Sequence, residues 1–333
     1  MKITYTPMTT TLNPILPDIN VPLSAQTVME LLLLSALWGG SFLFMRAAAP
    51  EFGPVALIAV RVALAALLML PLLLRRPERT ALRKHWRAIA VVGVFNSALP
   101  FCLFALAAVS LSAGFTAMLN ATAALWSAAL GWCFFGQRVQ PRAALGLALA
   151  LCGVVALVWS RLAWPDVAVS RTAVAWAIVA AVAATACYGA CAHYARLRLG
   201  DVSPLVVAAG SQAAAALLLA LPGWWLRPTA PPTTAAWLAV VGLGLLSTAL
   251  AYVLYFRLIA NIGAARAMTV TLLVPVIGVI LGVLVLGESI DMTSGLGALL
   301  VLLGTGLALN PQRSAPRDTF VEPSSDKTLE RTT

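Results

Sequence analysis

Residues 131–153 read GWCFFGQRVQPRAALGLALALCG, and residues 282–304 read GVLVLGESIDMTSGLGALLVLLG. Four glycines of the first stretch return in the second, each 151 positions further along the chain. Over the longer window 93–153, the same shift pairs five of the six glycines with glycine, whereas chance predicts about one such pair. The chain is therefore built from an internal repeat.

The composition is that of a polytopic membrane protein. Hydrophobic residues make up 61% of the chain and charged residues only 10%, and the mean hydropathy is +0.92. A soluble domain carries roughly 25% charged residues, and the apolar runs here reach the about 20 residues that cross a bilayer. The formal net charge of +10 does not indicate nucleic-acid binding, because the basic residues lie in short loops between apolar runs.

Loop signals divide the apolar part into ten predicted transmembrane helices, numbered here as spans 1 to 10. Helix is expected throughout because lipid offers no partners for backbone groups. The predicted spans are 29–49, 53–74, 88–108, 112–135, 142–160, 172–195, 203–222, 236–257, 264–286 and 292–310. Residues 29–160 form the first five-helix repeat and residues 172–310 the second. Residues 1–28 are an N-terminal tail, and residues 311–333 are a C-terminal tail that we expect to be disordered.

The distribution of basic residues predicts the orientation of the chain. With both termini in the cytoplasm, seventeen Lys and Arg residues lie on the cytoplasmic side and four on the other. Basic loops stay on the cytoplasmic side of membranes. We therefore expect a multi-pass protein of a bacterial inner membrane with both termini inside, and the lipid bilayer is its first partner.

An odd number of spans in each repeat has a consequence for function. The second copy must cross the membrane in the opposite sense to the first, so the fold class is an all-α membrane protein with two inverted five-helix repeats. Inverted repeats are an architecture of secondary transporters, whose substrate sites lie near the midplane between the halves. The repeat therefore favours a transporter with a midplane cavity that opens to each side in turn.

Several segments resemble the drug/metabolite transporter superfamily, in particular its ten-helix EamA-type branch. They are LWGGSFLFMR (37–46), the Pro54…Arg61 pattern of span 2, SLSAGFTAMLN (110–120) and NIGAARAMTVTLLVPVIGVILGVLVLGE (261–288). Gln137 and Ala124 depart from the pattern, since Glu288 and Pro275 stand at the matching places of the second half. The resemblance implies a transporter of small metabolites, often an exporter of amino acids, and does not choose the substrate.

Asn120 is an amide in the middle of an uncharged apolar span. Helical spacing places it on one face of span 4 with the small residues Ala113, Thr116, Ala123, Ser127 and Gly131. The repeat gives span 9 a matching face around Thr271. Asn120 and Thr271 are therefore either hydrogen-bond partners that join spans 4 and 9, or residues that meet the substrate where this seam reaches the cavity.

The remaining candidate substrate-binding residues occupy matching positions in the two halves. Small-molecule sites are mostly apolar and aromatic, with a few polar groups that fix orientation. The full set of candidates is Trp38, Ser41, Arg61, Asn96, Phe101, Thr116, Asn120, Tyr188, Ser247, Tyr252 and Thr271. Any single aromatic residue among them could equally serve in ordinary packing.

Arg61 is the one charge that cannot be placed at a membrane edge. It lies about nine residues into span 2, or about 13 Å at 1.5 Å per residue. An ionisable group at this depth faces a cavity or a partner. It either binds helix-end carbonyls or the surface, or it is a counter-charge for a substrate carboxylate.

The acidic residues and His193 lie near span ends. None of the twelve acidic residues is in mid-span, so proton coupling through a buried carboxylate is not expected. Glu288 is expected to cap span 10, because a carboxylate is favourable at a helix N-terminus. His193 is expected at the membrane interface, and the five cysteines are expected to be buried hydrophobes.

The sequence therefore predicts a monomeric secondary transporter that exports small amphipathic metabolites, amino acids above all, without cofactor or metal. One alternative is a transporter of drugs, nucleosides or sugars within the same superfamily. A membrane-embedded enzyme acting on lipid-linked substrates, and a scaffold or lipid scramblase, are the others. The long loops contain too few acidic and histidine residues for the surface clusters that such enzymes need.

Overall fold

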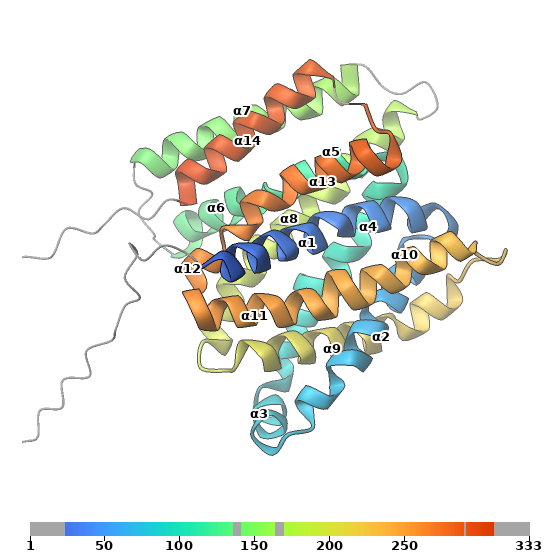
Figure 1. Cartoon of the computed structure of the whole chain (residues 1–333), viewed down its shortest axis with the longest axis vertical. Helices are drawn as coiled ribbons and strands as arrows, with labels where there is room; N and C mark the ends of the chain where they lie inside the picture. Colours follow the sequence, from blue (N-terminus) through green and yellow to red (C-terminus); the bar gives the residue numbers. More distant parts are fainter. Residues whose placement is uncertain (1–23, 136–140, 164–169, 290, 310–333) are drawn as a thin grey trace, which may run out of the picture.

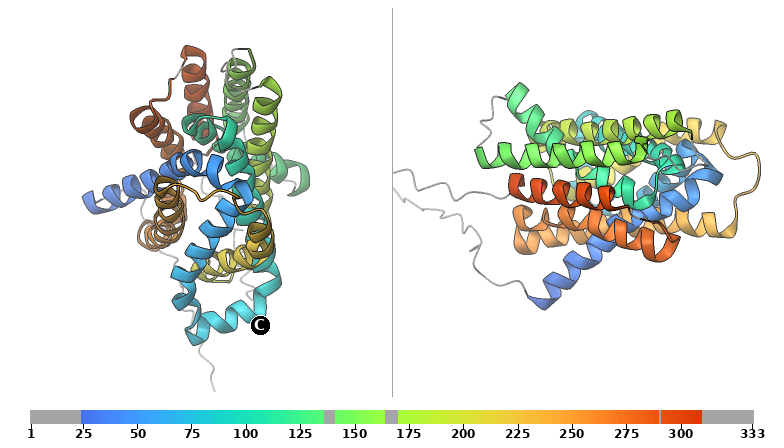
Figure 2. Two further views of the ribbon diagram at one scale, coloured as in Figure 1. Left: turned by 90° about the vertical axis from the view of Figure 1, so that its right-hand side faces the viewer. Right: turned by 90° about the horizontal axis from the view of Figure 1, so that it is seen from above.

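The structure is a computed structural model, and it describes residues 24–135, 141–163, 170–289 and 291–309. All regular secondary structure in these ranges is helical. Most of the helices run along one common direction (Figure 1, Figure 2). The predicted all-helical bundle is confirmed.

The ten predicted spans are all present in the described ranges, some as single helices and some as two or three consecutive segments. Spans 1 and 2 are α1 (Ala25–Phe52) and α2 (Pro54–Leu73), and span 5 is α7 (Pro141–Ala163). Spans 6, 7 and 10 are α8 (Arg171–Leu199), α9 (Pro204–Trp225) and α14 (Met292–Leu309). The segmented spans are span 3 (α3 Arg76–Val92, η1 Gly93–Ala98, α4 Leu99–Ser110), span 4 (α5 Ala113–Asn120, α6 Ala123–Phe135), span 8 (α10 Thr234–Gly244, η2 Leu245–Leu250, α11 Ala251–Ile262) and span 9 (α12 Ala264–Ala267, α13 Val270–Leu286).

Eight of these helical segments are long and apolar enough to cross a membrane, and Val270–Leu286 and Met292–Leu307 are shorter apolar helices. The largest difference from the predicted boundaries is in span 3. Its helix begins at Arg76, twelve residues before the expected start, because the basic stretch RPERTALRKHWR is itself helical. Pro77 at the first turn suits this start, since proline has no N–H to leave unbonded there.

The packing of helices follows the two repeats. α2 packs against its counterpart α9, and α7 packs against its counterpart α14. The last pair lies side by side at one edge of the bundle (Figure 1). Contacts between α1 and α13 are matched by contacts between α8 and α6. Spans of one half therefore meet the corresponding spans of the other half, as two inverted repeats require.

Glycines set the distance between α7 and α14. A Cβ atom on Gly153 would lie 2.6 Å from the carbonyl oxygen of Gly297, and one on Gly297 would lie 2.9 Å from the carbonyl oxygen of Gly153. Backbones approach this closely only where side chains are absent. The glycines that revealed the repeat are thus the residues that hold its outermost pair of helices together.

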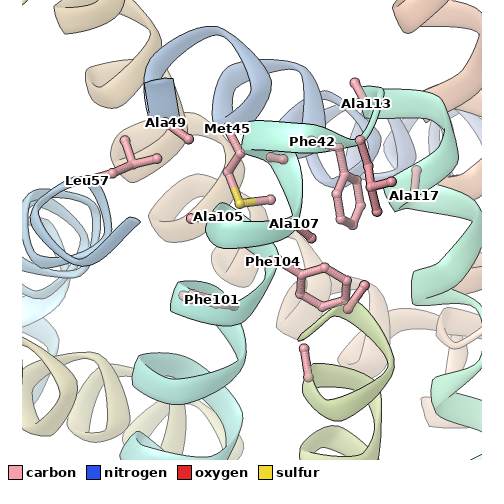
Figure 3. Packing of buried hydrophobic residues seen from close by; sticks show 14 of the residues in the cluster. Phe42, Met45, Ala49, Leu57, Phe101, Phe104, Ala105, Ala107, Ala113 and Ala117 are labelled. Carbon is pink, nitrogen blue, oxygen red and sulfur yellow. The ribbon is translucent and has the colours of Figure 1, made fainter. Parts of the chain in front are cut away.

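The largest hydrophobic cluster fills the space between α1, α2, α4 and the second repeat. Phe42 and Met45 of α1 point toward Phe104 and the alanines of α4 (Figure 3). Phe42 and Phe104 meet edge to face, with ring centroids 5.6 Å apart. Phe101, one turn before Phe104, lies under the guanidinium of Arg61.

Spans 3 and 8 each contain a π-helical segment, η1 and η2, at nearly equivalent places of the two repeats. A π-helix bonds each N–H five residues back, and such turns are frequently found at functional sites. η1 carries Asn96 and Ser97, and η2 carries Ser247 and Thr248. The sequence pattern predicted helix here and did not reveal the wider turn.

Candidate functional site

Span 4 and span 9 form part of the predicted small-residue seam. A Cβ atom on Gly278 would lie 2.5 Å from the Cβ of Ala117, and one on Gly114 would lie 3.1 Å from the Cα of Val279. The close approach of α5 and α13 is therefore confirmed. Beyond Asn120 the chain turns away, and α6 packs against α8, where Gly189 faces the backbone of Ser127.

The proposed hydrogen bond between Asn120 and Thr271 is wrong. The hydroxyl of Thr271 donates to the carbonyl oxygen of Met268 in its own chain segment, at 2.8 Å. Asn120 is the last residue of α5, just before a two-residue turn that separates α5 from α6. Its half-buried amide makes no side-chain hydrogen bond with the described residues. A helix interrupted within a span is a feature of transporter binding sites.

Arg61 is buried, with 5% of its surface exposed. Its Nε donates a hydrogen bond of 3.0 Å to Oγ1 of Thr248, and its Nη1 lies 3.9 Å from Sδ of Met45. The guanidinium lies over the ring of Phe101, 3.6 Å from the ring centroid. Arg61 therefore binds neither helix-end carbonyls nor the membrane surface, and the first of its two predicted roles is excluded among the described residues.

Thr248 receives this hydrogen bond because of the local geometry of η2. Its hydroxyl donates to the carbonyl oxygen of Leu243, five residues back, at 2.8 Å. With the hydroxyl proton engaged there, a lone pair of Oγ1 is left to accept from Nε of Arg61. The π-helical turn thus orients the residue that holds the guanidinium.

A second bond of the same kind joins spans 3 and 7. Nε2 of Gln212 on α9 donates to Oγ of Ser97 on η1 at 2.9 Å. Both side chains are fully buried. The Oε1 atom of Gln212 and the hydroxyl of Ser247 are buried without a hydrogen-bond partner. Buried polar atoms are rarely left unpaired, and Oε2 of Glu78 and Oγ1 of Thr305, on α3 and α14, are two further unpaired atoms among the described residues.

Aromatic residues from four spans surround the Arg61 site. Trp38 on α1 packs against Tyr252 and Tyr255 on α11, with centroids 6.5 Å and 5.1 Å apart. Tyr188 on α8 packs against Phe104 at 5.9 Å. The phenols of Tyr188 and Tyr252 lie in the neighbourhood of the Arg61 guanidinium.

Asn96 on η1 completes this arrangement. Its side-chain amide lies close to the hydroxyl of Tyr252. Asn96, Trp38, Tyr188 and Tyr252 are each only half-buried, although they come from the interior parts of their spans. We use the name central cluster for Trp38, Arg61, Asn96, Phe101, Tyr188, Thr248 and Tyr252. It draws on spans 1, 2 and 3 of the first repeat and spans 6 and 8 of the second.

Three other predicted site residues have hydroxyls that serve their own helices. Ser41 donates to the carbonyl oxygen of Trp38 at 2.6 Å. The hydroxyl of Thr116, which is fully buried, donates to the carbonyl oxygen of Ser112 at 2.8 Å. The hydroxyl of Thr271 bonds a carbonyl oxygen of its own chain segment in the same way. Such bonds satisfy the hydroxyl locally, so nothing in the geometry points these side chains at a ligand.

Glu288 does not have the predicted role. Its two carboxylate oxygens accept hydrogen bonds from the backbone N–H groups of Ala113 and Gly114, at 2.6 Å and 3.0 Å. It therefore caps α5 of the other repeat rather than span 10, whose first turn is capped by Asp291 through the N–H of Ser294. The favourable interaction with a helix N-terminus was expected, but with the wrong helix.

His193 is bonded inside the protein. It is buried, and its Nε2 lies 2.7 Å from the carbonyl oxygen of Ser127 on α6. α8 continues to Leu199, past the predicted end of span 6. His193 therefore joins the two repeats, and its position at the membrane interface stays a prediction.

The ends of the bundle are joined by further bonds across the repeats. At the end predicted to be extracytoplasmic, Glu51 accepts bonds from the backbone and hydroxyl of Thr233, at 2.7 Å and 2.9 Å. At the predicted cytoplasmic end, Glu30 pairs with Arg257 at 3.0 Å. Pockets of about 290 Å³ and 530 Å³ lie beside Glu51 and between α3 and α8. The midplane cavity stays a prediction.

The site candidates taken from the sequence do not include Thr248, Gln212 and Ser97. A partial signal existed in the repeat, because the shift of 151 that pairs the glycines also pairs Ser97 with Thr248. It does not reveal the two donors. Arg61 and Gln212 are not equivalent, since Gly244 lies against the carbonyl oxygen of Arg61 and its counterpart Gly93 lies against that of Ser211.

These features define a class of protein. The chain is a polytopic membrane protein of two inverted five-helix repeats, with a polar and aromatic cluster between them, as in secondary transporters. The model of the EamA-like transporter family matches residues 27–159 and 175–310, one match for each repeat. The chain therefore belongs to the EamA-like transporter family and is a membrane transporter of the drug/metabolite superfamily.

Two other proteins are similar along most of the chain. Uncharacterized protein PA1977 of Pseudomonas aeruginosa is 29% identical over 299 residues, which cover 86% of this chain and 96% of that protein. A protein crystal structure matches with a TM-score of 0.59 and 21% sequence identity, covering 86% of this chain and 97% of the other. The second likeness supports the fold alone.

Proposed function

We propose that this transporter moves small amphipathic metabolites, amino acids first among them, across a bacterial inner membrane by alternating access around the central cluster. The observation that carries the proposal is the composition of that cluster. It combines one buried cation, an amide and a hydroxyl with four aromatic rings, and both repeats contribute to it. A ligand with a polar head and an apolar side chain matches such a lining.

The position between the repeats supports alternating access. Residues from spans 1, 2 and 3 meet residues from spans 6 and 8 in the cluster. Rocking of one half against the other would therefore change the surroundings of a bound molecule while its contacts remain. Export is the direction that the family resemblance favours.

Counterflow in proteoliposomes tests this function. The purified full-length chain is reconstituted, loaded with an unlabelled compound and exposed to the same compound in labelled form. The panel contains the twenty amino acids, hexoses and nucleosides. We expect saturable uptake of one or more apolar amino acids, above the level of protein-free liposomes.

Uptake of sugars or nucleosides alone would replace the amino-acid proposal with the alternative substrates of the superfamily. Absence of saturable uptake for every member of the panel would contradict the proposed function. The orientation of the protein is measured separately, by labelling single cysteines placed in the tails. Both tails should react only from the cytoplasmic side.

A further inference from the structure

Building on the proposed function, we propose that Arg61 makes the central cluster a carboxylate site, in which the carboxylate of the transported molecule is required and an ammonium group is dispensable. The preferred ligands are then monocarboxylates with an apolar or aromatic side chain. Amino acids are members of this class and need not be its only members.

The first argument is the missing counter-charge. The acidic residues in the described ranges are Glu30, Glu51, Glu78, Asp201, Glu288 and Asp291, all near helix ends. The ion pair found among these residues joins Glu30 to Arg257, and no described carboxylate lies within 4.0 Å of Arg61. A buried cation without an anion is unfavourable, and the Phe101 ring offsets only part of that cost. An incoming carboxylate would supply the rest.

The second argument is the comparison of Arg61 with Gln212. Arg61 on span 2 donates to Thr248 on η2, and Gln212 on span 7 donates to Ser97 on η1. Ser97 and Thr248 are equivalent in the repeat, whereas the equivalent of Arg61 is Ser211, one position before Gln212. A neutral amide is nevertheless enough to bond the equivalent hydroxyl on η1. The charge of Arg61 is therefore not needed to join the helices, and another role must account for it.

The third argument concerns the donors that Arg61 does not use. A guanidinium has five N–H groups. Nε is bonded to Thr248, and Nη1 has only the weak acceptor Sδ of Met45. Nη2 has no hydrogen-bond acceptor among the described residues. Two neighbouring terminal nitrogens of this kind match the two oxygens of a carboxylate.

The surroundings distinguish the two ends of an amino acid. The described residues place no carboxylate near the cluster to bind an ammonium group. Its neighbours would be neutral acceptors, such as Asn96 and the phenols of Tyr188 and Tyr252. Neutral hydrogen bonds are roughly half as strong as charged ones. Loss of the carboxylate should therefore matter much more than loss of the ammonium group.

Four compounds with one side chain test this order directly. L-phenylalanine carries both groups, 3-phenylpropionate only the carboxylate, L-phenylalaninamide only the ammonium group, and 3-phenylpropionamide neither. The same four forms of the leucine side chain make a second set. Binding is measured by the thermal unfolding midpoint of the purified full-length protein in detergent, over a range of concentrations.

We expect the carboxylates to bind about 10- to 100-fold more tightly than the matching amides, the range for a charged hydrogen bond. Removal of the ammonium group should change binding by less than about threefold, as for one exposed neutral contact. Equal binding of acids and amides would overturn the proposal. So would a lack of binding by all the carboxylates in both sets.

Two variants separate the charge from the hydrogen bond. Arg61→Gln keeps a side-chain N–H donor and removes the charge, so it should fold and lose the preference for acids over amides. Gln212→Leu removes the bond to Ser97 and leaves the charge, so it should unfold at a lower temperature and keep the preference. If Arg61→Gln retained the preference, Arg61 would not be the carboxylate ligand.

If Arg61→Gln does not fold, Arg61→Lys tests whether Arg61 binds the carboxylate. It keeps a positive charge without the planar pair of donors, so we expect weaker binding with acids still preferred. A folded Lys variant that binds acids and amides equally would contradict the proposal.

The binding experiment and the counterflow experiment fail separately. Selective binding of carboxylates without counterflow would contradict the proposed function and leave the carboxylate site supported. Counterflow of amino acids with equal binding of acids and amides would support the proposed function and contradict the carboxylate site. The two conclusions can therefore be told apart with one protein preparation.

Discussion

The seam between α7 and α14 and the central cluster are built on opposite principles, although both lie where the two repeats meet. In the seam, Gly153 and Gly297 face each other's backbone directly. In the cluster, Arg61 is a buried charge without an ion-pair partner among the described residues. A design for stability alone would pair such a group. The comparison teaches that the seam holds the fold and the cluster serves the ligand.

The largest expected effect on stability is in the seam. Gly304→Ala places a Cβ against the backbone of Gly146 and Ala150, which cannot move aside as a side chain could. We expect a loss of about 1–3 kcal/mol in the free energy of unfolding, seen as a lower unfolding midpoint in detergent. Gly306→Ala on the same helix is the control, because no atom lies within 4 Å of its Cβ. Equal unfolding midpoints for the two variants would mean that the close glycine contacts between α7 and α14 do not hold the fold.

A smaller loss is expected at the bond between repeats that Glu288 makes. Glu288→Ala leaves the N–H groups of Ala113 and Gly114 without their carboxylate, and we expect a loss of about 1–2 kcal/mol. Ser112→Ala removes a cap of 3.2 Å at the same helix end, within one repeat. The unfolding midpoints of both variants are compared. A larger effect for Ser112→Ala would mean that the repeats are not joined through Glu288.

Hydroxyls near the cluster should contribute less again. Thr185 on α8 lies 2.8 Å from the hydroxyl of Thr122, which links spans 4 and 6. Thr185→Val should lower the free energy of unfolding by about 1 kcal/mol. Thr116→Val is the matched control, since the Thr116 hydroxyl is equally buried and bonds only its own helix. Chemical denaturation in detergent should find the Thr116 variant closer to the wild type.

The smallest effect on stability is expected for Asn120→Ala. The amide makes no side-chain hydrogen bond with the described residues, so the unfolding midpoint should hardly change. If Asn120 meets the substrate at the break between α5 and α6, counterflow should fall by about tenfold or more, as for a lost polar contact in a buried site. Normal transport with reduced stability would mean that Asn120 serves the packing of span 4 against span 9 instead.

Much of the fold could be predicted from the sequence because its signals are strong and local. Apolar runs fixed the ten spans. The glycine shift predicted the inverted repeat, because a glycine in a tight helix contact cannot be exchanged for another small apolar residue. The depth of Arg61 followed from counting residues along a rigid helix.

The errors have physical causes of a different kind. Glu288 was assigned to the nearest helix along the chain, but the helix N-terminus that it caps belongs to α5 of the other repeat, 174 residues away. A sequence does not show which helix end lies nearby in space. The bond between His193 and Ser127 of the other repeat was not predicted for the same reason. The segments η1 and η2 have no residue pattern that separates them from α-helix.

The matched hydroxyls of Ser97 and Thr248 bear on how such a protein could evolve after gene duplication. They occupy equivalent places of η1 and η2, yet their donors, Gln212 and Arg61, come from positions that are not equivalent in the repeat. A duplicated ancestor could therefore have kept the π-helical hydroxyl in both halves while each half acquired its own donor. Ancestry and ligand choice could then change independently.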